Sequence, residues 1–276
     1  MKKILYYILS IMVLLTFTCS GKIKKIKIAG STTVLPIIQA AAEEYVNLHP
    51  DTDISVRGGG SSIGILSIIN QIIDIGSASR PVNKQEIEML KNKNRDLIET
   101  AIALDAISII IHPENPVENL TLVQLQKIYS GQIENWLALG GKDQKLVVIS
   151  RDTPSGSFAV FNEIVLEQKK VRSDALMLAS NNAVATNVAV TPGAIGYVGI
   201  GYVNEQVKLI SISGIKPETE SIMNRAYPLT RELFMYTLAS TRSLAQEFID
   251  YLLAEQGQQI VEKQGYIRIK PAGLRQ

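Results

Sequence analysis

The sequence has very few of the side chains that build cross-links and metal sites. It contains one cysteine, Cys19, and two histidines, His49 and His112, among 276 residues. A single cysteine excludes a disulfide bond within the chain. Zinc sites need several Cys, His or carboxylate ligands at short spacings, and no group of these residues has such spacing. We therefore expect neither a metal site nor a cofactor.

The sequence also lacks an excess of charge of one sign. It has 28 Lys and Arg against 26 Asp and Glu, and removal of Lys2 and Lys3 with the signal peptide expected below leaves 26 of each. Proteins that coat nucleic acid or an anionic membrane carry a basic excess, which the mature chain does not have. We expect no nucleic-acid partner, and any bound anion must be held by a local arrangement of donors.

The N-terminus has the pattern of a secretory signal. Positively charged residues 1–3 are followed by the uncharged apolar run 4–17. This run is short for a membrane-spanning helix, which needs about 20 apolar residues. Cys19 stands where the run gives way to polar residues, a position that resembles a bacterial lipoprotein cleavage site. We predict a signal peptide at 1–18 and lipidation of Cys19; a secreted protein cut at another position is the alternative.

Downstream of the signal, strands, polar loops and helices alternate. Residues 23–29 alternate isoleucine with lysine as a strand does, and apolar residues recur at helical spacing over 34–46. The same order returns with a strand at 53–57 and a helix over 65–72. This repetition predicts an α/β architecture with a largely parallel sheet, in which ligands bind at the carboxyl ends of the strands. Further along we predict a capping pair at Asn83 and Glu86, a strand at 100–112 and helical structure over 243–263.

The segment 151–157 precedes a helical apolar pattern and is suited to a small oxyanion. Arg151 supplies a fixed charge, Ser155 and Ser157 supply hydroxyls, and Gly156 lets backbone N–H groups approach a ligand closely. Helix capping alone would explain each serine taken singly. The same chemistry recurs, however, in the other loops, which contain Thr32, Thr33, Ser61, Ser62, Ser79 and Arg80. Together these residues predict a site where short donors converge on a small anion.

Six motifs spread over most of the mature chain carry a family resemblance. They are GSTTVLP at 30–36, GSS at 60–62, DIGSASR at 74–80, YSGQIENW at 129–136, RDTPSGSF at 151–158 and TPGAIGYV at 191–198. With these motifs the chain resembles the phosphate-binding substrate-binding lipoproteins of bacterial ABC transporters, the PstS family. No single motif would suffice for this assignment.

The resemblance implies a type II periplasmic-binding-protein-like fold, in which two α/β domains are joined by a two-segment hinge with the ligand between them. Domain 1 would comprise 19–104 and 229–276, and domain 2 would comprise 105–228. The protein would be a monomer, lipid-anchored through Cys19 in the cell envelope and facing the periplasm. It would deliver inorganic phosphate to ABC permease subunits and would not be an enzyme.

The resemblance also implies the ligand residues. By motif position they are Thr32, Ser61, Ser79, Arg151, Ser155, Gly156 and Ser157, and the neighbouring Thr33 and Arg80 are further candidates. Some family members carry an aspartate where Ser79 stands, and it accepts the hydrogen bond of a protonated phosphate oxygen. Sulfate has no such proton near neutral pH, so a site with donors alone would not select phosphate. A receptor for sulfate or another tetrahedral oxyanion therefore remains an alternative interpretation. Asp152 either contacts the anion or holds Arg151 in position.

Two interpretations come from other classes of protein. The segment 60–64 fits the G-x-S-x-G pattern of serine esterases with Ser62 as the nucleophile, and His112 follows Asp105 in the order of a catalytic triad. The motif is short, and a serine in this loop is better explained as a donor to an anion. A purely structural or adhesive lipoprotein, the other interpretation, would bind no small ligand tightly.

Overall fold

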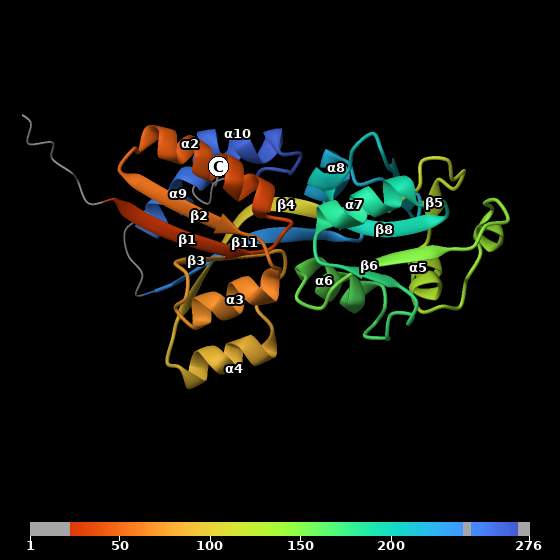
Figure 1. Cartoon of the computed structure of the whole chain (residues 1–276), viewed down its shortest axis with the longest axis horizontal. Coiled ribbons are helices and arrows are strands. Elements are labelled where there is room, and N and C mark those ends of the chain that lie inside the picture. Colours follow the sequence, from red (N-terminus) through yellow and green to blue (C-terminus); the bar gives the residue numbers. More distant parts are fainter. Residues whose placement is uncertain (1–22, 240–243, 270–276) are drawn as a thin grey trace, which may run out of the picture.

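The computed structural model describes residues 23–239 and 244–269. The predicted signal peptide and Cys19 lie outside these residues, and within them no helix is long and apolar enough to cross a membrane. The chain forms two α/β halves that lie side by side along the long axis, with two long strands running between them (Figure 1). The first half contains the beginning and the end of the described chain, and the second half contains its middle.

The first half is built on three parallel strands. These are β1 (Lys24–Gly30), β2 (Thr52–Arg57) and β3 (Ile75–Ala78), in the order β2-β1-β3. Helices cover both faces of the sheet (Figure 1). One face carries α2 (Leu35–Leu48), α9 (Leu244–Leu253) and α10 (Glu255–Lys263), and the other carries α3 (Ser61–Ile69) and α4 (Lys84–Asn92). The predicted order of strand, polar loop and helix is therefore confirmed.

The second half has the same layered construction. Its parallel strands are β6 (Val147–Arg151), β7 (Leu176–Leu178) and β8 (Ala194–Gly199). The helices α5 (Leu122–Tyr129) and α6 (Gly156–Ile164) share one apolar cluster, and α7 (Asn181–Val190) packs in another. The smaller elements are β5 (Asn119–Leu120), β9 (Lys208–Leu209), β10 (Ser211–Ile212), α8 (Thr219–Met223), and the 3-10 helices η1 (Trp136–Leu139) and η2 (Ile200–Tyr202).

Two strands, β4 (Leu97–Ile111) and β11 (Thr230–Leu238), join the halves. β4 pairs antiparallel with β11 up to Ala106 and with β8 from Ile107 onward, so one strand belongs to both parts of the sheet. The sheet is thus parallel among β1, β2 and β3 and among β6, β7 and β8, and it is antiparallel wherever β4 or β11 takes part in a pair. The predicted domain limits at 104/105 and 228/229 fall at this crossing, and the division into two domains stays a prediction.

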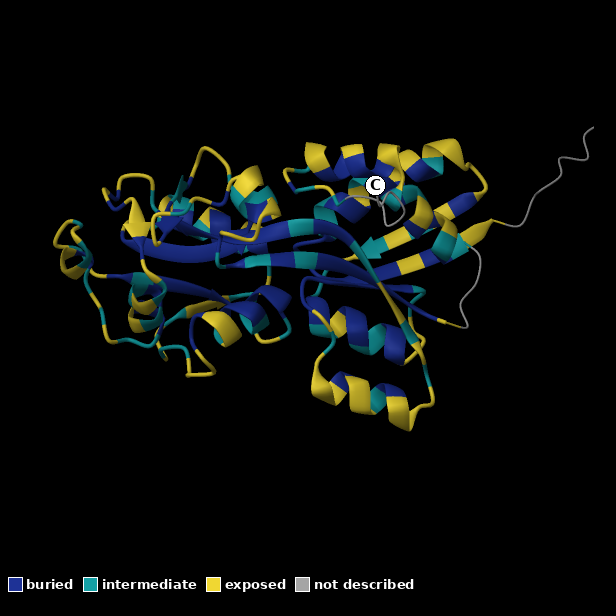
Figure 2. Cartoon of the chain, turned by 180° about the vertical axis from the view of Figure 1, so that it is seen from behind, coloured by how far each residue is buried: buried dark blue, intermediate teal, exposed yellow. Residues whose placement is uncertain are grey.

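Apolar side chains between the sheet and the helices hold each half together. Figure 2 shows the central strands as buried and the outer faces of the helices as exposed. Complete burial of a side chain of the size of isoleucine stabilises the fold by about 1.5–3 kcal/mol. In α2 the residues at the predicted helical spacing are buried, namely Ile37, Ile38, Ala41, Ala42 and Tyr45. This packing fixes the position of the polar loop that precedes the helix.

The structure confirms one predicted detail and adds a break to another. Asn83 and Glu86 form a capping box at the start of α4, with Glu86 N donating to Asn83 Oδ1 (2.9 Å) and Asn83 N to Glu86 Oε2 (2.8 Å). The segment predicted to be helical at 243–263 is helical from Leu244 to Lys263, but it forms two helices, α9 and α10, interrupted at Ala254, which has extended backbone angles; residue 243 lies outside the described residues. The interruption lets α10 fold back until Gly257 touches the backbone of Leu252, where a Cβ atom would clash.

Candidate oxyanion-binding site

The first wall of the site consists of polar loops from the first half. Thr32 and Thr33 lie between β1 and α2, Ser61 begins α3, and Ser79 follows β3. All four side chains are buried. The Ser61 hydroxyl accepts a hydrogen bond from Ser79 N (2.9 Å) and lies 3.4 Å from Ser79 Oγ. The three loops leave the carboxyl ends of neighbouring parallel strands, which is where ligands bind in sheets of this kind.

The second wall is the turn between β6 and α6. Arg151 ends the strand, and the Ser155 hydroxyl caps the helix by accepting a hydrogen bond from Phe158 N (3.2 Å). The N–H groups of Gly156 and Ser157, the first two residues of α6, have no acceptor within the helix and lie at the positive end of its dipole. Capping and anion binding are therefore compatible, because the cap uses a different N–H group.

Hydrogen-bonding side chains connect the two walls directly. Arg151 Nη2 donates to Thr32 Oγ1 (3.2 Å), and the hydroxyls of Thr33 and Ser157 lie 3.3 Å apart. These pairs are separated by more than 100 positions in the sequence. The two polar walls, one from each half, therefore form a single buried cluster.

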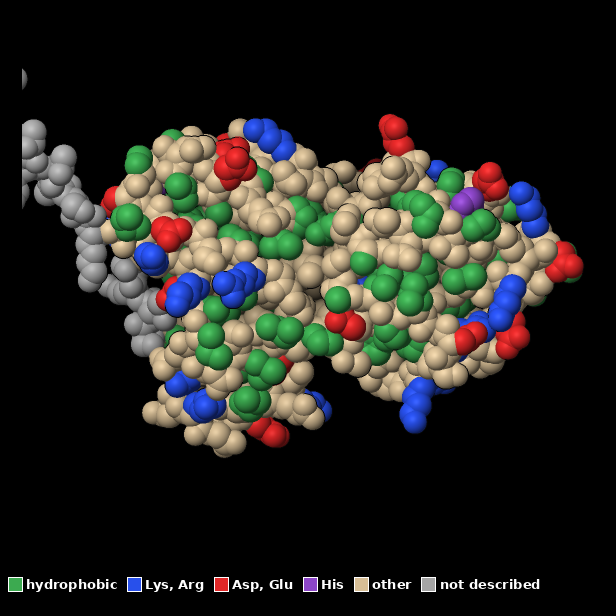
Figure 3. Space-filling view, in the orientation of Figure 1, with side chains coloured by type: hydrophobic (Ala, Val, Ile, Leu, Met, Phe, Trp, Pro, Cys, Tyr) green, Lys and Arg blue, Asp and Glu red, His purple; other side chains and the backbone are tan. Residues whose placement is uncertain are grey.

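Gly156 lies close to two serines of the first wall. A Cβ atom at this position would clash with Ser61 Oγ and would lie 2.6 Å from Ser79 Oγ. In the space-filling view the two halves meet along a narrow boundary (Figure 3). The structure thus brings together all of the predicted ligand residues except Arg80, namely Thr32, Thr33, Ser61, Ser79, Arg151, Ser155, Gly156 and Ser157.

Arg151 supplies positive charge deep in this cluster. Its side chain is 1% exposed, and it donates from Nε to Leu178 O (3.0 Å) and from Nη2 to Ala179 O (2.9 Å). Nη1 is buried and has no hydrogen-bond partner among the described residues. Burial lowers the pKa of Arg151 and the charge of Asp152 opposes this shift, yet an arginine stays protonated at neutral pH. A buried cationic donor without an acceptor destabilises the fold, and an oxyanion would supply the acceptor.

Asp152 lies beside Arg151 without a hydrogen bond to it. Its Oδ1 is 3.8 Å from Arg151 Nη2, and this oxygen is buried with no hydrogen-bond partner among the described residues. Burial raises the pKa of Asp152, and the charge of Arg151 opposes this shift. The Asp152 carboxylate therefore neutralises the positive charge of Arg151 only in part. Its Oδ1 atom is still able to accept a proton or a hydrogen bond.

Arg80 is the one predicted ligand whose guanidinium is directed elsewhere. Nη1 and Nη2 donate to the two carboxylate oxygens of Glu86 (2.8 and 2.7 Å), and they donate further to Pro81 O (2.8 Å) and Ser62 Oγ (2.9 Å). The N–H groups of both terminal nitrogens are therefore used within the first half, because α4 offers a buried carboxylate. The pair with Glu86 ties the loop that carries Ser79 to the start of α4, and the bond to Ser62 ties the same loop to the start of α3.

Replacing Glu86 with alanine is expected to lower the free energy of unfolding by about 3 kcal/mol, because it leaves a buried guanidinium without its counter-charge. Denaturant unfolding measures this loss. Glu88→Ala is the matched control, since Glu88 is exposed on the same helix. Equal stability of the two variants would contradict a structural role for the Arg80–Glu86 pair.

Two side chains that the sequence did not indicate also reach the cluster. Asn181, at the start of α7, donates from Nδ2 to the hydroxyls of Thr32 and Thr33 (3.3 and 3.0 Å). Arg231, in β11, donates from Nη2 to Ser157 Oγ (2.9 Å) and Thr33 Oγ1 (3.3 Å). In the sequence, Asn181 is only a polar residue at a helix start, and Arg231 is only a charged residue inside an apolar strand. Both patterns are common, so neither singles out a binding residue.

The arrangement does not support a serine esterase. His49 stacks on Tyr45 with ring centroids 4.2 Å apart, and His112 Nδ1 accepts a hydrogen bond from Glu114 N (3.3 Å). In the described part of the chain neither histidine is hydrogen-bonded to Ser62, whose hydroxyl instead accepts from an arginine. The same part contains no group of three His, Cys, Asp or Glu residues that could hold a metal ion.

The fold and the loop-built site between two halves define a class of binding protein. Residues 18–256 match the family described as the PBP superfamily domain. The phosphate-binding protein PstS of Borreliella burgdorferi is 33% identical, with 98% of this chain and all of that protein covered. PstS of Bacillus subtilis is 35% identical, with 88% of this chain and 80% of that protein covered.

Solved structures of phosphate-binding proteins are also similar to this chain. A phosphate ABC transporter substrate-binding protein from Clostridium perfringens, with bound phosphate, is 34% identical with a TM-score of 0.84, covering 90% of this chain and all of that one. An ABC-type phosphate transport receptor from Vibrio cholerae is 33% identical with a TM-score of 0.74, covering 88% of this chain and all of that one. The chain belongs to the PBP superfamily and, within it, to the PstS family.

Proposed function

We propose that this protein captures inorganic phosphate between its two halves and delivers it to an ABC-type phosphate importer. The observation that carries the proposal is the Nη1 group of Arg151, a buried cationic donor without a partner among the described residues. It belongs to a cluster of hydroxyls and helix N-terminal N–H groups, which together suit a small tetrahedral anion. Membership of the PstS family and the phosphate in the Clostridium perfringens structure support the same ligand.

Hinge closure is the proposed mechanism, with domain 1 at 19–104 and 229–276 and domain 2 at 105–228. The pairing of β4 with both halves supports a hinge at this crossing. Direct contacts support closure, since Tyr202 Oη donates to Thr32 O (2.5 Å) and Ser62 N donates to Pro154 O (3.1 Å). Phosphate bound to Thr32, Thr33, Ser61 and Ser79 on one side and to Arg151, Ser155, Gly156 and Ser157 on the other shifts the population toward the closed form.

The N-terminal pattern and the family support the cellular setting that we propose. The signal peptide 1–18 is removed, and Cys19 is lipidated and anchors the protein in the cell envelope, facing the periplasm. The receptor is a monomer, its partners are the permease subunits of the importer, and it catalyses no reaction. Only the lipid anchor attaches it to the membrane.

Phosphate is expected to bind about tenfold to a hundredfold more tightly than sulfate. The proton of phosphate donates to an acceptor, Ser79 Oγ or the free oxygen of Asp152, whereas fully ionised sulfate places another acceptor there. Calorimetric titration at neutral pH measures both affinities after endogenous anion has been removed by unfolding and refolding. Equal affinities would mean that the protein is a general receptor for tetrahedral oxyanions and not a phosphate receptor. Failure to bind either anion would contradict the proposal.

A further inference from the structure

Arg231 and Asp105 form a buried ion pair at the crossing between the halves. They are register partners in the antiparallel pairing of β11 with β4. Arg231 Nε donates to Asp105 Oδ2 (2.8 Å), and Nη2 lies 2.7 Å from the same oxygen. Asp105 Oδ1 accepts a hydrogen bond from Ile200 N (2.9 Å). The carboxylate is therefore satisfied by one edge of the Arg231 guanidinium and one backbone N–H group.

The rest of the Arg231 guanidinium faces the polar cluster. Nη2 donates to Ser157 Oγ in the second wall and to Thr33 Oγ1 in the first wall. Nη1 is buried and has no hydrogen-bond partner among the described residues. Arg231 thus contacts a predicted ligand residue on each wall and still has a free terminal nitrogen.

Neutralising Asp105 does not account for this arrangement. Nε and Nη2 complete the ion pair, whereas a buried Nη1 without an acceptor only adds a desolvation penalty. Arg151 and Arg231 are the two arginines of the cluster, and each has a buried Nη1 without a partner. One added anion with several oxygens could accept hydrogen bonds from both nitrogens, because each oxygen of such an anion carries more than one lone pair.

We infer that Arg231 is a second arginine of the anion site, and that it donates from Nη1 to the oxyanion which Arg151 also binds. The inference rests on the proposed function and adds a third source of ligand contacts. Besides the two walls, the site has a floor, which is formed by β4 and β11, the strands that join the halves. The site therefore carries two guanidinium groups, of which only Arg231 has a directly bonded carboxylate.

Phosphate titration of three variants tests this role. In Asp105→Asn/Arg231→Gln both members of the ion pair become neutral amides, so no buried charge is left unpaired. Arg231→Lys keeps a positive charge beside Asp105 but loses the second terminal nitrogen. Arg225→Gln is the control, because Arg225 is an exposed arginine of the same region that is paired with Glu232. Thermal unfolding without phosphate shows whether each variant keeps its fold.

The double variant is expected to bind phosphate about tenfold to a hundredfold more weakly than the wild type, and Arg231→Lys at least about tenfold more weakly. Arg225→Gln should leave the affinity unchanged. If the double variant binds phosphate with wild-type affinity, Arg231 only supports the fold and the inference fails. If the double variant does not fold, wild-type affinity in Arg231→Lys leads to the same conclusion. In both cases the proposed phosphate function stands. A wild-type protein that binds no phosphate would overturn the proposed function itself.

Discussion

Replacing Arg151 with glutamine is expected to weaken phosphate binding by at least about a hundredfold, since charge-assisted hydrogen bonds to an oxyanion are about twice as strong as neutral ones and the site also loses a positive charge. Arg151 is 1% exposed, and its free Nη1 lies in the buried cluster. Glutamine retains polar atoms that can bond Leu178 O or Ala179 O, so the fold should persist. Calorimetric titration with phosphate measures the affinity, and circular dichroism checks the fold.

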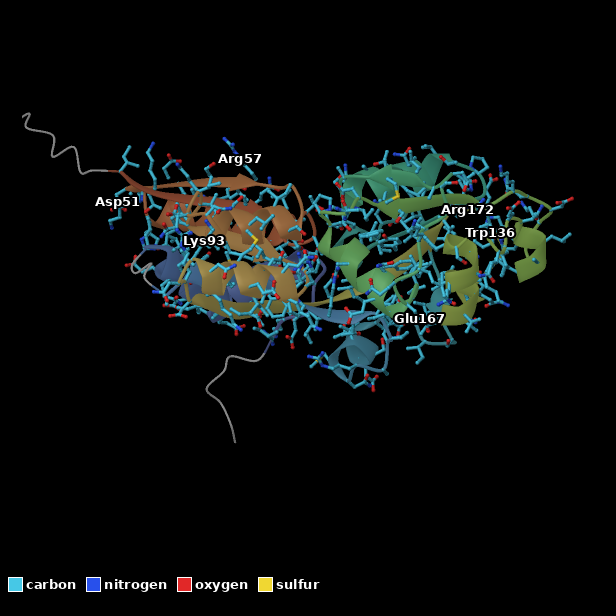
Figure 4. All side chains as sticks on the ribbon, turned by 90° about the horizontal axis from the view of Figure 1, so that it is seen from below. Asp51, Arg57, Lys93, Trp136, Glu167 and Arg172 are labelled. Atoms are coloured by element: carbon cyan, nitrogen blue, oxygen red, sulfur yellow. The ribbon has the colours of Figure 1, made fainter. Side chains whose placement is uncertain are left out.

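Arg57→Gln is the matched control for this change. Arg57 ends β2, close in sequence to Ser61, but it is exposed and points away from the body of the protein (Figure 4). Its replacement should leave the phosphate affinity unchanged. If Arg151→Gln folds and binds phosphate as tightly as the wild type, the anion does not bind in this cluster, and the proposed site is wrong.

Gly156→Ala is expected to produce the second large effect, a loss of at least about tenfold in phosphate affinity with the unliganded fold retained. The new Cβ atom would clash with Ser61 Oγ and lie 2.6 Å from Ser79 Oγ, so the walls could not close to the observed distance. Both serines are buried and have little room to move. In an open form the same alanine would be harmless, because alanine favours helix over glycine by up to about 1 kcal/mol.

Small-angle scattering with and without phosphate separates closure from folding in this variant. The wild type should become more compact when phosphate is added, whereas Gly156→Ala should not. Glu163→Ala serves as the control, because Glu163 is exposed on the same helix. A Gly156→Ala protein that closes and binds normally would mean that the contact between the walls is not needed for capture.

Local sequence patterns were sufficient to predict much of the fold and of the site. The alternation of apolar and polar residues predicted β1, α2 and β2, because burial of one face requires that spacing whatever the remaining chain does. The candidate anion donors at 151–157 are recognisable because a strand end, a helix start and the donor residues are adjacent in the sequence. The capping box at the start of α4 is local for the same reason.

Features that depend on distant partners were missed or misassigned. Arg80 stands beside Ser79 in the sequence, yet its guanidinium is held by Glu86. Arg231 lies 74 positions from Ser157 and joins the site only through the pairing of β11 with β4. The break at Ala254 likewise reflects the packing of α10 on α9. No local pattern specifies which of several possible partners a long charged side chain will meet.

The sequence by itself therefore determined the α/β class, the presence of candidate anion donors in the loops and the near balance of charge, because these follow from composition, spacing and residues adjacent in the chain. Only the tertiary structure decided which arginines face the site and how the halves are joined. The reason is that a guanidinium can turn toward any acceptor within its reach, and strand pairing and burial decide which acceptors are near. Arg80 was thereby assigned to the scaffold, and Arg231 became a candidate for the floor of the site.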